Sequence, residues 1–383
     1  MTPPRQPLSN VGSRYAAARE SLRERAAPYL GIDPRALGAF RVALALLLLG
    51  DLLRYRLPGM RAFYTDDGVL TRSTLAELYP LLETVSIHAV SGSTWVQAGL
   101  LAIAAVAAVS LLVGYRTRAS TGVSLVLLAS LYARNPYVIN GGNTILVVFL
   151  FLGLFLPLDA RWSLGSSRRK VRSDRIEITA RGEEEGNDGV DHRVCSLGTV
   201  VTLLTLVSIY AANVVSKYRS DAWMSGIAVP RIFQVEEFVV FLGPFVAERA
   251  AVLAAMNWLW IALLSVSVLL IAPDERLRVG AALAFVSAHL GMAATMRLGV
   301  FPFVMIAVLL LFFPPRAWDA VEALTSRVHA PAPSGGRAYR SDGGSADATA
   351  SSGPSAHSRG RRGVRAVGYT RLRAEAPKAG GVG

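Results

Sequence analysis

The stretch that decides the fold is LGTVVTLLTLVSIYAANVVSKYRSDAWMSG, residues 197–226. Its first part, from Leu197 to Val215, is strongly apolar and contains no charged residue. An α-helix needs roughly 20 mostly apolar residues to cross the hydrocarbon core of a bilayer. Lys217 follows this run directly, and Trp223 comes soon after it. The segment therefore predicts a membrane-spanning helix, and it leaves open whether Lys217 marks the membrane edge or takes part in chemistry.

The same pattern recurs along the chain. Of its 383 residues, 52% are hydrophobic and 17% are charged, with a mean hydropathy of +0.40, whereas a soluble domain has about 25% charged residues. Eight apolar runs have roughly the length of a span: 37–54, 95–114, 119–134, 143–158, 197–216, 250–272, 277–297 and 299–314. The third, fourth and eighth are short, and we expect them to tilt little, to be partly buried or to re-enter the membrane. The sequence predicts an all-α fold, a polytopic integral membrane helical bundle of about eight transmembrane helices.

Three flanking segments differ in composition from these runs. Residues 1–36 are basic and lack the features of a signal peptide, which predicts a cytoplasmic amphipathic segment on the membrane surface. The transmembrane domain is expected over 37–318, with a cytoplasmic linker at 159–195. Residues 319–383 are rich in Arg, Gly and Ser, so we expect a disordered cytoplasmic tail.

Arginine is unevenly distributed between the predicted loops. The N-terminal segment, the turns at 114–118 and 273–278, the 159–195 loop and the tail all carry it. By the positive-inside rule these segments face the cytoplasm. The prediction is a multi-pass protein of the cell membrane with both termini cytoplasmic. The net charge of +13 then suits anionic lipid, and we expect the lipid bilayer and no nucleic acid as a partner.

Metal and disulfide chemistry find little support in the sequence. Cys195 is the only cysteine, and the five histidines have no metal-ligand spacing, so no metal is predicted. Asp66 and Asp67 before Gly68 favour a tight turn, with a metal site as the alternative.

Polar residues within or beside the apolar runs are costly in a membrane and therefore indicate pairing or function. Asp51 and Arg54 are three residues apart, share a helix face and can neutralise each other, either as a structural pair or to shape a site. Asn140 and Asn143, in NPYVINGGN (135–143), can cap a turn or donate hydrogen bonds into a cavity. His289 can be a buried neutral histidine bonded to a backbone carbonyl, or part of a site.

These polar positions share a predicted location. Asp51, Arg54, Asn143, Lys217 and His289 all lie near the outer ends of predicted spans. In a helical bundle, ligand sites form between helices. We therefore expect these side chains to converge on one outward-facing cavity.

Five segments together resemble a known family: RVALALLLLGDLLRYR (41–56), FYTDDGVL (63–70), NGGNTILVVFLFLGLFLPLD (140–159), YAANVVSKYRSDAWMSG (210–226) and AHLGMAATMRLGVFPFVMIA (288–307). In combination they resemble the horizontally transferred transmembrane (HTTM) domain family, which includes the membrane domain of vitamin K-dependent gamma-carboxylase. The resemblance covers roughly residues 37–318. It implies a helical membrane domain with its functional groups at the outer face.

The resemblance also implies roles for residues. Lys217 matches the lysine that deprotonates reduced vitamin K, with His289 and Asn143 orienting the substrate, and a reduced naphthoquinone as cofactor. Desolvation at the membrane edge would favour the neutral amine that this chemistry needs. Ser216 stands where the carboxylase has a second lysine, and Asn143 or Gly142 stands where it has a histidine. A large extracytoplasmic domain is not evident in this sequence, so carboxylation directed by a propeptide is not supported.

Two hypotheses for the function follow. The first is a quinol-dependent oxygenase or carboxylase with Lys217 and His289 as catalytic residues, and with Asn140, Asn143, Asp51, Arg54 and Trp223 binding the substrate. The second is a non-catalytic membrane protein that binds a lipid, a quinone or a peptide in the same cavity. In the second, Lys217 only anchors its helix at the head groups. The sequence does not name a protein or peptide substrate.

Overall fold

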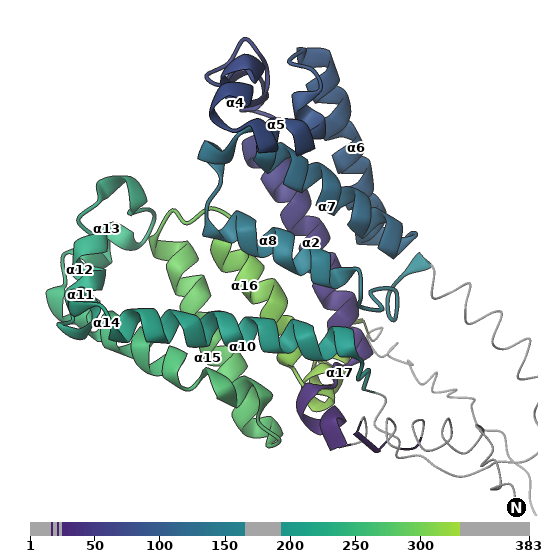
Figure 1. Cartoon of the computed structure of the whole chain (residues 1–383). Helices are drawn as coiled ribbons and strands as arrows, with labels where there is room; N and C mark the ends of the chain where they lie inside the picture. The colour runs from purple at the N-terminus through teal and green to yellow at the C-terminus, as the bar shows by residue number, and fades with distance from the viewer. Residues whose placement is uncertain (1–16, 18–20, 23–24, 165–192, 330–383) are drawn as a thin grey trace, which may run out of the picture. The chain divides into compact units, whose positions relative to one another are not determined.

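The computed structural model describes residues 17, 21–22, 25–164 and 193–329. Within that part of the chain every regular element is a helix, and the only β-type pairings are two isolated bridges, Ile32 with Val194 and Val239 with Met296. The predicted all-α fold is confirmed (Figure 1). We call the end of the bundle that holds Asp51 the outer end, after the predicted orientation.

The helices follow one another in the order of the predicted spans. The first half consists of α2 (Pro34–Asp51), a π-helical turn (Leu52–Arg56), α3 (Met60–Tyr64), α4 (Arg72–Leu78), α5 (Pro80–Val85), α6 (Thr94–Val113), α7 (Thr117–Arg134) and α8 (Gly141–Gly153). The second half consists of α10 (Leu197–Tyr218), α11 (Asp221–Met224), α12 (Ala228–Ile232), α13 (Gly243–Ala247), α14 (Ala250–Ser265), α15 (Glu275–Thr295), α16 (Phe301–Leu309) and α17 (Pro315–His329). Short 3₁₀ turns lie at Ile87–Ala89, Pro136–Val138, Glu236–Phe238, Ser267–Ile271 and Leu310–Phe312.

Each of the eight predicted spans contains a helix, but the helices differ in length and polarity. In the described part of the chain, four are long and apolar enough to cross a membrane: Pro34–Arg56, Thr94–Val113, Leu197–Tyr218 and Glu275–Thr295. Helices α8 and α14 are apolar but shorter. Residues Phe301–Phe312 make a fifth span only if they are joined to α17, which leaves them at an angle of 104°. The structure thus supports a membrane protein, and the count of eight stays a prediction.

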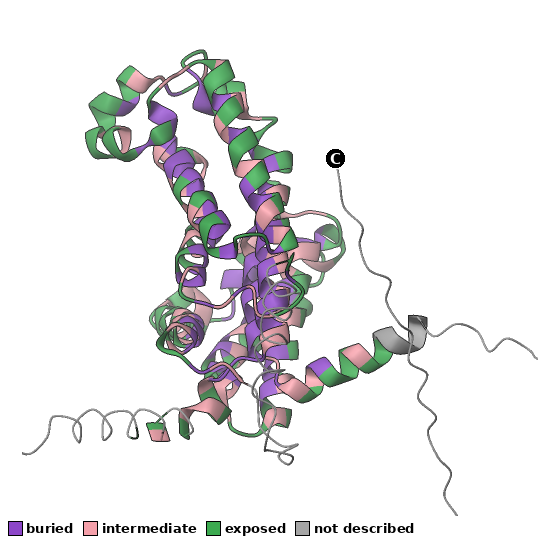
Figure 2. Ribbon diagram, turned by 90° about the vertical axis from the view of Figure 1, so that its right-hand side faces the viewer, coloured by how far each residue is buried: buried purple, intermediate pink, exposed green. Residues whose placement is uncertain are grey.

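The core lies where the central helices meet. Helix α2 packs against α6 and α16, and α16 packs against α8 and α15. On α2 the fully buried Leu37, Phe40 and Leu44 follow helical spacing along one face. Figure 2 shows buried residues concentrated between the helices and exposed residues on their outward faces. In a bilayer those exposed apolar faces contact lipid.

Buried arginines hold the inner end together. The fully buried Arg41 donates from Nη1 to the carbonyls of Leu111 and Leu112, and from Nη2 to that of Trp162. The first two carbonyls belong to the last turn of α6, where helix carbonyls carry partial negative charge. Arg278 similarly donates to the carbonyls of Pro28 and Tyr29. Arg278, one of the arginines that mark the predicted inner face, therefore bonds within the protein instead of contacting lipid.

Two groups of short helices cover the outer end. The first outer cap is residues 57–93, with α3, α4 and α5, and the second outer cap is residues 219–249, with α11, α12 and α13. In the first, Asp66 accepts hydrogen bonds of 2.9 Å from the backbone N and from Nε of Arg72. Asp66 therefore stabilises the first outer cap by bonding two parts of it to each other. Among the described residues, no three His, Cys, Asp or Glu side chains come together to hold a metal.

Some of the expected boundaries need comment. Helix α17 continues to His329, so the residues directly after 318 are helical where a disordered tail was expected. A 104° bend between Phe312 and Pro315 separates this helix from α16. Most of the predicted N-terminal segment, most of the 159–195 linker and the rest of the tail lie outside the described residues.

Candidate ligand-binding cavity at the outer end

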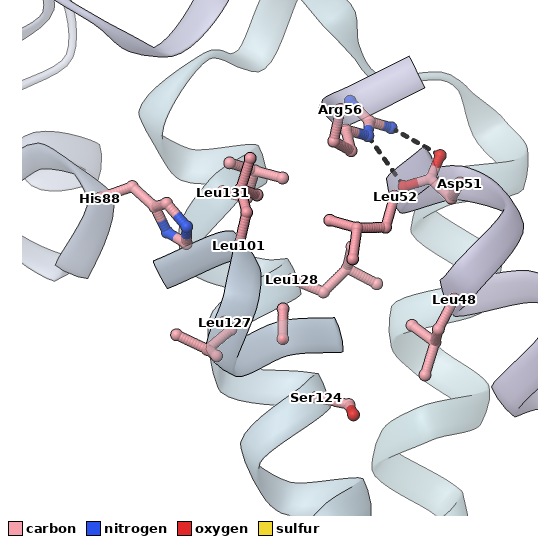
Figure 3. A pocket seen from close by; sticks show the side chains of 11 residues that line it. Leu48, Asp51, Leu52, Arg56, His88, Leu101, Ser124, Leu127, Leu128 and Leu131 are labelled. Carbon is pink, nitrogen blue, oxygen red and sulfur yellow. Dashed lines mark hydrogen bonds and ion pairs between the residues drawn. The ribbon is translucent and has the colours of Figure 1, made fainter. Parts of the chain in front are cut away.

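An ion pair at the outer end of α2 is formed by a local change of helix type. Residues Leu52–Arg56 adopt a π-helical turn, in which Leu57 N donates to Leu52 O at 2.8 Å. A π-turn brings residues five apart over one another. Asp51 therefore pairs with Arg56, through Nε–Oδ2 at 2.8 Å and Nη2–Oδ1 at 3.1 Å. Figure 3 shows this ion pair as dashed lines. Both residues are buried.

This pairing corrects the sequence prediction. The expected partner of Asp51 was Arg54, because ordinary α-helical spacing places residues three apart on one face. Arg54 is instead exposed, and its guanidinium carbon lies 5.5 Å from the ring centroid of Tyr55. The wider π-turn rotates Arg54 away from Asp51 and brings Arg56 into its place.

Arg56 also connects α2 to neighbouring helices. Its Nη1 donates to the hydroxyl of Tyr64, on α3, at 2.8 Å. The guanidinium carbon lies 5.0 Å from the ring centroid of Tyr132, on α7, a cation–π distance. The Tyr132 hydroxyl in turn accepts a hydrogen bond of 2.9 Å from Nδ2 of Asn143. A continuous polar network thus runs from α2 to α8.

Asn140 and Asn143 have the capping role that the sequence left open, and both also line a cavity. Asn140 Oδ1 accepts from the backbone N of Gly142 and of Asn143, and Asn143 Oδ1 accepts from Asn140 N, so the pair forms a capping box at the start of α8. A Cβ on Gly142 would stand 2.6 Å from the backbone of Phe301, whereas one on Gly141 would meet nothing within 4 Å. Gly142 therefore lets the start of α8 approach the start of α16.

These residues line a cavity of about 220 Å³. Its walls are Asp51, Tyr55, Arg56, Phe63, Tyr64, Val138, Asn140, Asn143, Gly299 and Val300. Burial raises the pKa of the Tyr64 phenol, although the nearby Arg56 charge lowers it. The phenol thus stays protonated while its oxygen accepts from Arg56, and its own proton remains available. The cavity offers several hydrogen-bond donors around one neutralised ion pair.

An apolar groove of about 440 Å³ adjoins this cavity. It runs between α2 and α16, and its walls are Ala43, Leu46, Leu47, Gly50, Asp51, Arg54, Tyr55, Gly299, Val300, Phe303, Ile306, Ala307 and Leu310. The cavity and the groove share Asp51, Tyr55, Gly299 and Val300. A Cβ on Gly50 would meet nothing within 4 Å, so the groove is open there. A polar chamber is therefore continuous with an apolar channel.

A much smaller cavity, of about 30 Å³, lies on the other side of the ion pair. Asp51, Arg56, His88 and Ser124 line it together with leucines of α2, α6 and α7 (Figure 3). His88 Nε2 and Ser124 Oγ are buried without a protein hydrogen-bond partner, and the volume suffices for a water molecule. Burial, with the charge of Arg134, lowers the pKa of His88 to about 4. His88 is therefore neutral at physiological pH.

Lys217 lies away from this cavity. Its Nζ donates to Oδ1 of Asn213 at 3.3 Å and stands 4.6 Å from the ring centroid of Trp223. Lys217 and Trp223 are half-buried, and Asn213 is exposed. Neither Lys217 nor Trp223 lines the cavity or the groove. These two predicted site residues contact each other, but not the network around Asp51.

His289 is fully buried in a cluster of aromatic rings. Its Nδ1 donates to the carbonyl of Phe285 at 2.7 Å. This is the first of the two alternatives from the sequence, a buried histidine bonded to a backbone carbonyl. The ring centroids of Tyr210, Trp260 and Phe301 lie 6.2, 5.6 and 5.8 Å from that of His289. His289 Nε2 and the Tyr210 hydroxyl are both buried, and neither has a hydrogen-bond partner among the residues that the structure describes. We call this group the aromatic cluster; His289 does not line the cavity or the groove either.

The structure therefore divides the expected set of site residues. Asp51, Asn140 and Asn143 share the cavity, Arg54 lines the adjoining groove, and Lys217, Trp223 and His289 lie elsewhere. Sequence reasoning missed Arg56, Tyr64 and Tyr132. Arg56 was visible as a second arginine after Asp51, but its role depends on the π-turn. The tyrosines carried no spacing signal, because they come from other helices.

Fold and site together define a helical membrane protein with an amphipathic cavity at one end. The family model of the HTTM domain matches residues 189–318, so the resemblance to this domain family is confirmed for that part of the chain, whereas the likeness to the carboxylase stays a prediction. The matched region contains Lys217, His289 and the Gly299–Val300 wall of the cavity, but not Asp51 or Arg56. No curated protein and no solved structure gives a match to this chain.

Proposed function

We propose that this protein binds an amphipathic lipid, with its polar head in the cavity beside Asp51 and Arg56 and its apolar chain in the groove between α2 and α16. The observation that carries the proposal is the set of shared walls: the same four residues border the polar chamber and the apolar channel. Ligand sites typically combine an apolar lining with a few convergent polar groups. Here the two kinds of lining are separated along one axis, as in a lipid.

The polar wall favours a head group with hydrogen-bond acceptors. Asp51 takes up only part of the donor capacity of Arg56, since a guanidinium has five N–H groups. Tyr64 adds a hydroxyl proton, and Asn140, exposed at the rim, adds an amide. The carbonyl oxygens of a quinone match these donors, and a hydroquinone hydroxyl can donate to the free lone pairs of Asp51. A naphthoquinone of the vitamin K type is our first choice of ligand.

The groove can be tested separately from the head cavity. Gly50→Leu adds a side chain in the open part of the groove, and leucine is a better helix former than glycine, so the fold is expected to persist. Gly99→Leu on α6 is the matched control, because Gly99 is also exposed and a Cβ there also meets nothing within 4 Å. Binding of a long-chain menaquinone and of tail-less menadione would be measured in nanodiscs.

We expect Gly50→Leu to weaken menaquinone binding by at least about tenfold, roughly 1.4 kcal/mol, and to leave menadione binding and the Gly99→Leu control unchanged. Tyr64→Phe should weaken both quinones, because it removes a donor at the head. Equal menaquinone binding by Gly50→Leu and wild type would contradict the groove. Failure of wild type to bind either quinone above empty nanodiscs would contradict the choice of a quinone.

A second candidate function is a quinol-dependent oxygenase or carboxylase with Lys217 as the base. One observation favours it: within the described part of the chain, the half-buried Lys217 ammonium contacts two neutral groups, the Asn213 amide and the Trp223 ring. Tyr210 of the aromatic cluster lies seven residues earlier on α10, about 10 Å along the helix axis. A quinol would have to lie between Lys217 and that cluster for His289 to share in the chemistry.

The test of this second function uses reduced menaquinone and oxygen with the purified protein. Quinone epoxide formed by wild type and absent from Lys217→Ala, at equal membrane insertion, would support Lys217 as the base. Protein that binds the quinol but forms no epoxide would leave the binding function as the answer. The same preparation, screened with added peptides, would show whether a peptide substrate exists.

The proposal also includes the topology predicted from the arginines. The protein would be a multi-pass protein of the cell membrane with both termini in the cytoplasm, which places the cavity at the outer face. Reporter fusions at the C-terminus and within the second outer cap test this orientation. Cytoplasmic activity of the reporter in the cap would reverse it.

A further inference from the structure

The second outer cap contains an apolar segment that the cavity does not use. Residues 238–247, FVVFLGPFVA, contain no charged side chain, and they are bounded by Glu236 and Glu237 before and by Glu248 and Arg249 after. The three phenylalanines of the segment are exposed by 46%, 77% and 65%, in the order Phe238, Phe241 and Phe245. An exposed aromatic group of this kind marks an interaction surface. We call residues 238–247 the phenylalanine loop.

The backbone holds Phe241 in a conformation that few residues other than glycine adopt. Phe241 has φ +48°, in the left-handed region. On either side of it, Val240 N donates to Thr295 O and Leu242 N donates to Ala294 O, both at 3.0 Å. These carbonyls end α15, where helix carbonyls lack intrahelical donors. The loop is therefore fixed to α15 by its backbone, and the ring of Phe241 is left largely exposed.

The phenylalanine loop lies beside a lipid-facing surface. Helix α13, which carries Phe245, ends at Ala247, and α14 begins at Ala250. Helix α14 contains no charged residue, buries its Asn257 and exposes Val252, Trp258 and Leu259. Figure 1 shows α13 at the margin of the bundle, above α12, and α13 packs against α14 and α15. The exposed phenylalanines thus continue the apolar surface of α14 at its predicted outer end.

We propose that the phenylalanine loop inserts into the outer leaflet of the bilayer, with Phe241 and Phe245 at the boundary between head groups and acyl chains. Aromatic residues are enriched at this depth, and apolar segments bounded by charges bind there. A lipid occupant is favoured over a protein partner because ten consecutive residues lack any charge, whereas protein interfaces have a polar rim with hydrogen bonds. The charged residues on either side of the loop set the depth of insertion.

The experiment takes advantage of the single cysteine. In a Cys195→Ala background, Phe245→Cys and, separately, Phe241→Cys are labelled with the environment-sensitive dye NBD in the full-length protein in nanodiscs. Glu237→Cys is the matched control, because Glu237 is exposed on the same cap and is expected in water. Quenching is compared between lipids with a doxyl group near the head-group end and aqueous iodide.

We expect doxyl lipid to quench the dye at 245 at least about twofold more than at 237, and iodide to show the reverse order. Position 245 lies in helical backbone and carries the conclusion if Phe241→Cys folds poorly. Equal iodide quenching at 241, 245 and 237, with no excess quenching by doxyl lipid, would overturn the proposal and leave a surface for a soluble partner. Phe241→Gly adds a check: it removes the strain, so its melting temperature in detergent should not fall if the ring serves the membrane rather than the fold. A fall would show that the ring packs on its own chain.

Discussion

Two buried polar clusters, both near the predicted outer end, differ in how their polar atoms are satisfied. Around Asp51, the carboxylate, the Arg56 guanidinium and the Tyr64 hydroxyl bond to one another and border a cavity. Around His289, the rings of Tyr210, Phe285 and Trp260 are packed, and Nε2 of His289 and the hydroxyl of Tyr210 have no partner. The polar atoms of the first cluster are hydrogen-bonded to one another and border a cavity. The second cluster is closely packed, and two of its polar atoms have no hydrogen bond.

The cluster that the family match covers is not the cluster that forms the cavity. The family match covers the aromatic cluster and Lys217, while most of the cavity comes from residues outside the matched region. A buried polar atom without a partner costs free energy, so its persistence needs a reason such as a bound water, a ligand or a function. The cavity shows where a ligand fits. The unbonded polar atoms of the aromatic cluster show where a further hydrogen-bond partner is expected.

The largest effect is expected from breaking the ion pair. Arg56→Met leaves Asp51 buried with an unpaired charge, which should lower the free energy of unfolding by about 3–5 kcal/mol. Arg54→Met is the control, since Arg54 is exposed and not bonded to Asp51. Denaturation in detergent measures both. If both variants lost the same free energy of unfolding, the result would favour the Asp51–Arg54 pair that α-helical spacing predicted.

The next effect depends on pH and concerns His88, on the far side of the ion pair. Burial and the charge of Arg134 lower its pKa to about 4 in the folded state, against about 6.5 when unfolded. Its contribution to stability is therefore complete above pH 6.5 and is lost as the pH falls from there toward 4. The loss should approach about 3 kcal/mol. The Nδ1 atom of His88 lies 2.9 Å from Oγ of Ser130, a hydrogen bond that an asparagine amide can replace. His88→Asn should therefore remove this part of the pH dependence; identical profiles for variant and wild type would contradict it.

Removing one hydroxyl from the bonded cluster should cost less. Tyr64→Phe takes the acceptor from Arg56 Nη1, a hydrogen bond of 2.8 Å to a charged donor. The free energy of unfolding should fall by about 1.5–3 kcal/mol. The same denaturation experiment measures this loss. An unchanged free energy of unfolding would contradict the prediction and would mean that Arg56 Nη1 bonds to another acceptor in the cavity.

A Tyr→Phe substitution in the aromatic cluster should change the free energy of unfolding least. It should raise that free energy, whereas Tyr64→Phe lowers it. Tyr210→Phe removes a buried hydroxyl without a partner, so the free energy of unfolding should stay level or rise by up to about 1 kcal/mol. The stacked contact with Phe285, at 4.2 Å between centroids, remains. A clear loss of stability would show that the hydroxyl does bind something, and it would erase the contrast with Tyr64.

The positions of the helices could be predicted from the sequence because a span must be long, apolar and internally hydrogen-bonded. Part of the site could be predicted for the same reason: Asp51, Asn140 and Asn143 stood out as polar residues next to apolar runs. Arg56 could not, since its pairing depends on a π-turn that shifts the usual spacing of three or four residues to five. The groove could not either, because it forms only where Gly50 of α2 faces α16.

The sequence by itself determined that this is an all-α membrane protein, where its long apolar helices lie and which polar residues needed partners. Those properties follow from local composition and from the cost of polar groups in hydrocarbon. Only the tertiary structure decided which partners were found: Arg56 for Asp51, Trp223 for Lys217, and an aromatic cluster for His289. The physical reason is that pairing and cavities arise between helices, where helix type, close approach and side-chain packing set distances that no spacing along one chain contains.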